Sequence, residues 1–174
     1  MKAIEVANGK KTDCFTALPD LEVPMINSLV SCLAREHLKL DEQIMQLALV
    51  ATRLAADPND NQTSARAMEV WESIRRYLWS HLQIEDELVL TWGEAHRAIA
   101  VALGETLENE RREMRRLLAV LGSYAGLRGT SEDSSDREGF AKSLLALSRT
   151  LATHVERYEG EVLPAIQRAL FHAA

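Results

Sequence analysis

WESIRRYLWSHLQIEDELVLTW, residues 71–92, is the stretch of sequence that decides the fold. Apolar residues recur in it every three or four positions almost throughout, which is the spacing of a helix with one buried face. His81 and Glu85 interrupt this apolar series one helical turn apart, so both side chains leave the same face and can converge on one point. The whole series is Trp71, Ile74, Leu78, His81, Glu85, Leu88 and Trp92.

A carboxylate on a buried helix face needs a compensating charge. Burying Glu85 without a partner would cost on the order of several kcal/mol. A metal ion held by His81 and Glu85 is the simplest way to supply that charge. The segment therefore predicts a helix whose buried face carries metal ligands.

The composition of the whole chain favours a single all-α domain. The 174 residues are 47% hydrophobic but only 5% aromatic, with few Gly and Pro residues. A net charge of −6 argues against a general nucleic-acid or anionic-membrane binder. We find no signal peptide, membrane-spanning run or disulfide framework, so we expect a cytoplasmic protein.

Two helices with buried faces are predicted in the first half of the chain. Apolar residues recur at helical spacing over residues 26–54, with His37 in the middle of the series. A turn rich in Asp, Asn and Pro ends this helix. The second helix is predicted over residues 65–92, with Thr63 or Ser64 as its N-cap.

A third helix is predicted over residues 103–121. Its buried series includes Glu110, and Gly122 is read as the signal that ends it. The preceding segment, residues 94–104, is either a short connecting helix or the first turns of this third helix. The Gly-, Ser- and Asp-rich residues 126–139 predict a mobile loop.

The fourth predicted helix begins at residue 140 and carries His154 and Tyr158 in its buried series. Pro164 lies inside the pattern and is expected to bend or break the helix. Residues 81–91 align with residues 154–164 without gaps. The second and fourth helices therefore look like copies of one unit, each pointing a His inward.

Four amphipathic helices with modest loops predict an all-α, up-down antiparallel four-helix bundle over residues 26–174, preceded by an N-terminal arm at residues 1–25. A single His on an apolar face is more often hydrogen-bonded in a core than bound to a metal. Three such His residues from three helices, together with a Glu, favour a metal site. Imidazoles suit Fe, Zn and Cu, while carboxylates can bridge two hard cations. The residues concerned are His37, His81, His154 and Glu85.

These residues give the chain a resemblance to the hemerythrin-like (HHE cation-binding) domain family. His37 in AREHLKLDEQI, His81 and Glu85 in HLQIEDELVL, and His154 in HVERYEGEVLP match the family's His and HxxxE motifs. The resemblance covers residues 26–170 and implies a four-helix bundle around a non-haem di-iron centre. It also implies that the three His residues are terminal ligands and that Glu85 is a bridging carboxylate.

The sequence departs from the family pattern in the third and fourth helices. Tyr158 stands where the family usually has a second bridging Glu, and could be a ligand, a hydrogen-bond donor or a core residue. Glu159 follows it, and would need a local π-helical widening to face the site. The third helix has no His, and Glu110 or Arg111 stands at the expected place. Glu110 could replace the missing imidazole as a ligand.

The resemblance implies iron as the cofactor, as two non-haem ions, with one ion or another divalent metal as the alternative. The implied function is to bind, sense or reduce a small ligand such as O2, NO or peroxide, and any redox or signalling partner is expected to be a separate protein. Two other functions stay open. One is a helical regulatory or interaction module with a degenerate metal site, and the other is iron storage or delivery.

Overall fold

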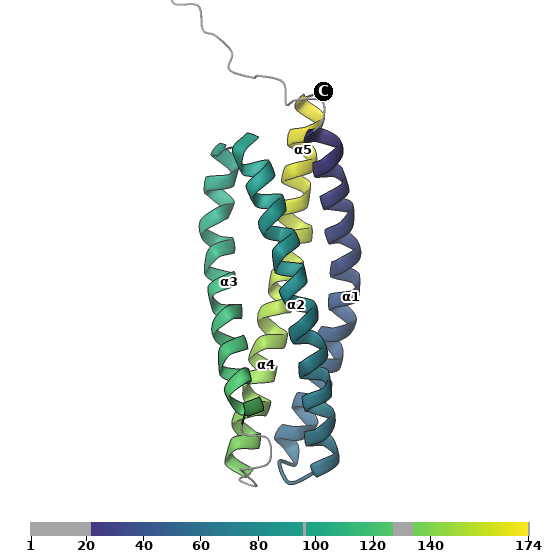
Figure 1. The fold of residues 1–174 in the computed structure, drawn as a ribbon, viewed down its shortest axis with the longest axis vertical. Coiled ribbons are helices and arrows are strands. Elements are labelled where there is room, and N and C mark those ends of the chain that lie inside the picture. Colours follow the sequence, from purple (N-terminus) through teal and green to yellow (C-terminus); the bar gives the residue numbers. More distant parts are fainter. Residues whose placement is uncertain (1–21, 96, 127–133, 174) are drawn as a thin grey trace, which may run out of the picture.

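The computed structural model describes residues 22–95, 97–126 and 134–173, and the regular secondary structure in them is entirely helical. The elements are α1 (Glu22–Ala56), α2 (Asn61–Ala95), α3 (Arg97–Gly126), α4 (Ser134–Arg157), the π-helical η1 (Tyr158–Val162) and α5 (Leu163–Ala173). Three of them, α4, η1 and α5, follow one another without a gap and form one long rod. The chain runs down α1, up α2, down α3 and up this rod (Figure 1). The predicted all-α four-helix bundle is confirmed.

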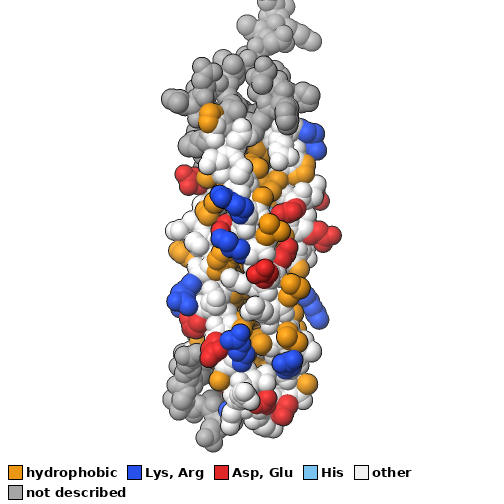
Figure 2. Space-filling view, turned by 90° about the vertical axis from the view of Figure 1, so that its right-hand side faces the viewer, with side chains coloured by type: hydrophobic (Ala, Val, Ile, Leu, Met, Phe, Trp, Pro, Cys, Tyr) orange, Lys and Arg blue, Asp and Glu red, His pale blue; other side chains and the backbone are white. Residues whose placement is uncertain are grey.

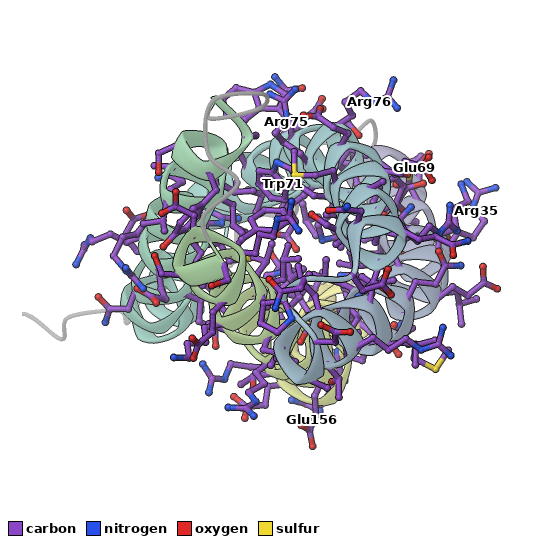
Figure 3. All side chains as sticks on the ribbon, turned by 90° about the horizontal axis from the view of Figure 1, so that it is seen from below. Arg35, Glu69, Trp71, Arg75, Arg76 and Glu156 are labelled. Atoms are coloured by element: carbon purple, nitrogen blue, oxygen red, sulfur yellow. The ribbon has the colours of Figure 1, made fainter. Side chains whose placement is uncertain are left out.

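The buried faces of the helices follow the predicted spacing. Viewed along the bundle, Trp71 lies among the helices, while Arg75 and Arg76 of the same helix point outward (Figure 3). On the face shown in Figure 2, positive and negative side chains are interspersed along the length of the bundle. The buried residues of α1 are Val30, Leu33, His37, Leu40, Ile44, Leu47, Val50, Ala51 and Leu54.

The N-terminus of α2 differs from the prediction, because Asp60 rather than Thr63 or Ser64 caps it. Asp60 Oδ1 accepts hydrogen bonds from the backbone N–H groups of Gln62 (2.9 Å) and Thr63 (3.2 Å). The Thr63 hydroxyl donates to the other carboxylate oxygen at 2.5 Å. The two predicted caps lie inside the first turn, since α2 begins at Asn61.

The third helix is longer than predicted at both ends. Residues 97–104 form its first turns, which decides between the two alternatives for that segment, while His96 lies outside the described residues. The expected stop at Gly122 is wrong, because α3 continues to Gly126. Beyond the glycine, Tyr124 packs edge-on against Phe140 of α4 with ring centres 6.0 Å apart. This packing offsets the low helix propensity of glycine.

The predicted loop at residues 126–139 is also shorter than expected. Residues 134–139 are the first turns of α4, and the structure does not describe residues 127–133. Asp136 lies in the first turn of α4, where its negative charge complements the helix dipole. Arg137 donates a hydrogen bond of 3.2 Å to the carbonyl of Pro58, which ties this turn to the loop between α1 and α2. Contacts with another part of the chain therefore accompany the extension of α4 into the polar residues 134–139.

The interruption expected near Pro164 takes the form of a π-helical segment. α4 ends at Arg157, and the backbone N–H of Leu163 donates to the carbonyl of Tyr158, five residues earlier. Pro164 is the second residue of α5 and directly follows the π-helical segment. The rod therefore widens by one residue before the proline instead of breaking at it.

The predicted N-terminal arm, residues 1–25, lies mostly outside the described residues, and α1 already begins at Glu22. Among the described residues, no helix combines the length and apolar character needed to span a bilayer.

Replacing the N-cap tests the start of α2. We expect Asp60→Ala to lower the thermal midpoint by about 3 °C, because two backbone N–H groups lose their acceptor. Ser64→Ala is the matched control, since it removes the hydroxyl that the sequence pattern named as a possible cap. Thermal unfolding followed by circular dichroism compares the two, and a larger loss in Ser64→Ala would contradict the observed cap.

Candidate metal centre

Three imidazoles and one carboxylate meet in the core of the bundle. His37 comes from α1, His81 and Glu85 from α2, and His154 from α4, and all four are completely buried. One ligand atom from each residue lies within 4.8 Å of the corresponding atoms of the other three. The helical spacing of the sequence predicted all four inward positions.

One oxygen of Glu85 faces all three imidazoles. Its Oε1 atom lies 2.8 Å from His154 Nε2, 3.0 Å from His81 Nε2 and 3.8 Å from His37 Nε2. The contact with His154 has hydrogen-bond geometry, whereas the Nε2 atoms of His37 and His81 have no hydrogen-bond partner. A single carboxylate oxygen cannot satisfy three imidazoles at once. A cation among these atoms would take a lone pair from each of them.

Two further carboxylates contact the outer nitrogens of the imidazoles. His37 Nδ1 lies 3.3 Å from Glu159 Oε1, and His154 Nδ1 lies 3.3 Å from Glu110 Oε2. Glu110 also accepts a hydrogen bond from Arg157. A carboxylate that accepts the Nδ1 proton fixes the tautomer of the ring and leaves Nε2 free as a ligand atom. Glu110 and Glu159 therefore orient the imidazoles that face Glu85.

The π-helical segment accounts for the position of Glu159. The sequence indicated that this residue would need a π-helical widening to face the site, and η1 begins at the preceding residue, Tyr158. The side chain of Glu159 is 49% exposed, so it reaches His37 from the solvent side and does not enter the cluster. The widening brings the carboxylate to the outer edge of the site.

Arg111, and not Glu110, is the buried residue of α3 beside the cluster, so the predicted buried series of this helix is wrong at this position. The series along α3 was expected to bury Glu110, but Arg111 is buried at 7% exposure and Glu110 is only partly buried. Arg111 Nη2 lies 3.6 Å from Glu85 Oε2, and Nη1 lies 2.8 Å from Asp86 Oδ1. A four-residue step from Leu107 reaches Arg111, and this was the available signal.

Tyr158 packs against two of the imidazoles of the cluster. Its ring is completely buried, with its centre 5.1 Å from that of His154 and 5.5 Å from that of His37. The hydroxyl has no hydrogen-bond partner. Burial, and after it the charge of Glu85, raises the pKa of Tyr158, although nearby Arg111 acts in the opposite direction. An unused O–H donor therefore lies beside the cluster.

The electrostatics of the cluster favour a carboxylate surrounded by positive charge. Burial by itself would raise the pKa of Glu85, but the imidazoles of His154, His37 and His81 hold this pKa well below its usual value. Burial would likewise lower the pKa of His154. Hydrogen bonds to Glu110 and Glu85 outweigh that effect and raise the pKa to about 9. A metal ion that binds His154 must displace this proton.

Buried polar atoms without hydrogen-bond partners concentrate at this site, which fits a bound cation. Buried polar groups in folded proteins are normally satisfied, and a cluster of exceptions indicates a missing ion or ligand. Three nitrogens and one carboxylate oxygen in this arrangement are a suitable donor set for a metal. The atoms with a lone pair to offer are His37 Nε2, His81 Nε2, Glu85 Oε2 and the Tyr158 hydroxyl oxygen.

Of the seven residues predicted to bind metal, the structure brings four into the cluster itself. Glu110 and Glu159 contact the outer nitrogens of the imidazoles, and Tyr158 lies against two of the rings. The four residues of the cluster are His37, His81, Glu85 and His154.

Comparison with known proteins agrees with this arrangement. No curated protein and no solved structure matches the chain. The family model described as the hemerythrin HHE cation binding domain matches residues 28–166, which include every residue of the cluster. The resemblance drawn from the His and HxxxE motifs is confirmed. The chain belongs to the hemerythrin HHE cation-binding domain family.

Proposed function

We propose that the buried cluster binds non-haem iron and that the bound iron in turn takes a small ligand such as O2, NO or peroxide. The observation that carries this proposal is the convergence of three imidazole Nε2 atoms on one oxygen of Glu85. Imidazole and carboxylate donors without a thiolate suit iron better than the soft metals that prefer sulfur. The family to which the chain belongs supports a cation at this place.

The surroundings of the cluster favour a site sheltered from water. His37 lies on α1 between Leu33 and Leu40, which belong to two separate apolar clusters of the core, and both leucines are completely buried. Leu88 continues the buried face of α2 beyond Glu85. Exclusion of water strengthens polar interactions with a bound ligand and limits side reactions with water.

Each residue of the site has a definite task in this proposal. His37, His81, His154 and Glu85 would hold the iron, which would supply redox chemistry and open coordination positions. The Tyr158 hydroxyl would donate a hydrogen bond to the small ligand. Reduction of such a ligand would need electrons, which we expect to come from a separate redox protein.

A Glu85→Gln substitution tests whether the cluster holds iron. The amide keeps the size of the side chain but removes the charge that three imidazoles surround, so we expect at least a tenfold loss of Fe(II) affinity. Glu87→Gln is the matched control, because Glu87 lies two residues away on the exposed face of α2. Iron per chain, measured after anaerobic Fe(II) reconstitution, gives the result.

Two outcomes of that measurement would contradict the proposal. Equal iron content in Glu85→Gln and Glu87→Gln would mean that the metal binds elsewhere. A wild-type protein that holds no iron after reconstitution would favour an interaction module that has kept the fold without the metal.

A Tyr158→Phe substitution tests the ligand-binding part of the proposal. It removes only the buried hydroxyl, so we expect unchanged iron content and roughly a tenfold weaker affinity of the ferric protein for azide, a stable stand-in for peroxide. Tyr124→Phe is the control, because Tyr124 packs against Phe140 instead of the cluster. Azide titration followed by visible absorption gives both dissociation constants. Equal values would contradict the donor role, and loss of iron from Tyr158→Phe would make Tyr158 a ligand.

A further inference from the structure

Arg111 brings a fixed positive charge into the core. It is the one Lys or Arg that is buried among the described residues of the bundle. Its guanidinium is anchored through Nη1 to Asp86 at 2.8 Å, while Nε and Nη2 have no hydrogen-bond partner. A buried guanidinium is always charged, and it is retained where it meets a buried negative charge. That negative charge is Glu85.

The two oxygens of Glu85 face different positive groups. Oε1 faces the three imidazoles, whereas Oε2 lies 3.6 Å from Arg111 Nη2. A carboxylate that bridges two metal ions uses one oxygen for each ion. In this chain the second oxygen already has a cationic neighbour. A second metal ion on Oε2 would therefore meet a positive charge in a medium that screens it poorly.

In the part of the chain that the structure describes, the side of the cluster near Arg111 also lacks free ligands for a second ion. Glu110 of α3 is turned toward His154 Nδ1 and Arg157, and Glu159 is turned toward His37 Nδ1. Asp86 is paired with Arg111 itself. Among the residues that the structure describes, the remaining oxygen donor beside the cluster is the Tyr158 hydroxyl. The cluster therefore has enough donor atoms to bind one metal ion, but too few to bind two.

We infer that the guanidinium of Arg111 takes the place of a second metal ion and that the centre therefore holds a single ion. The inference rests on the proposed function, because it assumes that the His and Glu cluster binds metal. Arg111 supplies the positive charge that a second ion would bring to Glu85. As a fixed cation it balances the carboxylate whether or not metal is bound.

Metal stoichiometry tests this directly. The metal-free protein is titrated anaerobically with Co(II), and the d–d absorption bands and electron paramagnetic resonance report the number of bound ions and any coupling between them. We expect saturation at one uncoupled Co(II) per chain. Two tightly bound, magnetically coupled ions would overturn the inference and leave the proposed function intact. No binding at all would instead remove the proposed function.

Substitution of Arg111 tests whether this residue excludes the second ion. Arg111→Glu replaces the charge with a ligand, and we expect a second Co(II) to bind at least tenfold more tightly than any second equivalent in the wild type. Arg111→His is the neutral alternative should the added carboxylate impair folding. The controls are Arg112→Glu and Arg112→His, which make the same changes at the exposed neighbouring residue. We expect both controls to bind one Co(II) per chain.

These paired variants separate a loss of packing from a change in metal binding. A disrupted core would lower stability without creating a second site, so only a gain of metal supports the inference. If both Arg111 variants bind the same amount of Co(II) as their Arg112 controls, the guanidinium is not what keeps the second ion out.

Discussion

The buried carboxylate of Glu85 is the constraint on which the centre of this bundle depends. A fully buried carboxylate is stable only when positive or hydrogen-bonding groups surround it. Here each of the other three rods contributes one group: His37 from α1, Arg111 from α3 and His154 from α4. The balance of charge around Glu85 therefore ties the four rods together, and a rotation of any rod would leave a buried charge without its partner.

Orientation of the imidazoles depends on groups outside the cluster. Glu110 and Glu159 contact the outer nitrogens of His154 and His37, which directs the inner nitrogens toward Glu85. The contact of Glu159 with His37 coincides with the π-helical segment η1. Such single-turn widenings are found frequently at functional sites, because they change the direction of a side chain without ending the helix. Here the π-helical segment begins one residue before Glu159, which contacts His37 from the solvent side.

The departures of this chain from its family pattern lie on one side of the cluster. The fold and the three His residues with Glu85 are retained, while α3 contributes Arg111 and η1 contributes Tyr158. These two residues place a cation and a phenol beside Glu85, where the family resemblance implies further metal ligands. A shared fold therefore does not settle the chemistry, which depends on the particular side chains at the site.

The sequence by itself determined the four helical rods and the inward positions of His37, His81, Glu85 and His154, because helical spacing is a local property of the chain. Tertiary structure decided the rest. Local propensity indicated that α3 ends at Gly122. The helix continues to Gly126, because Tyr124 packs against Phe140 of α4. Adjacent residues of a helix differ by only about 100° in direction, and the helical spacing wrongly selected Glu110 in place of Arg111 as the buried residue. That choice depends on how α3 is rotated against its neighbours, and the charge of Glu85 favours the rotation that buries the guanidinium.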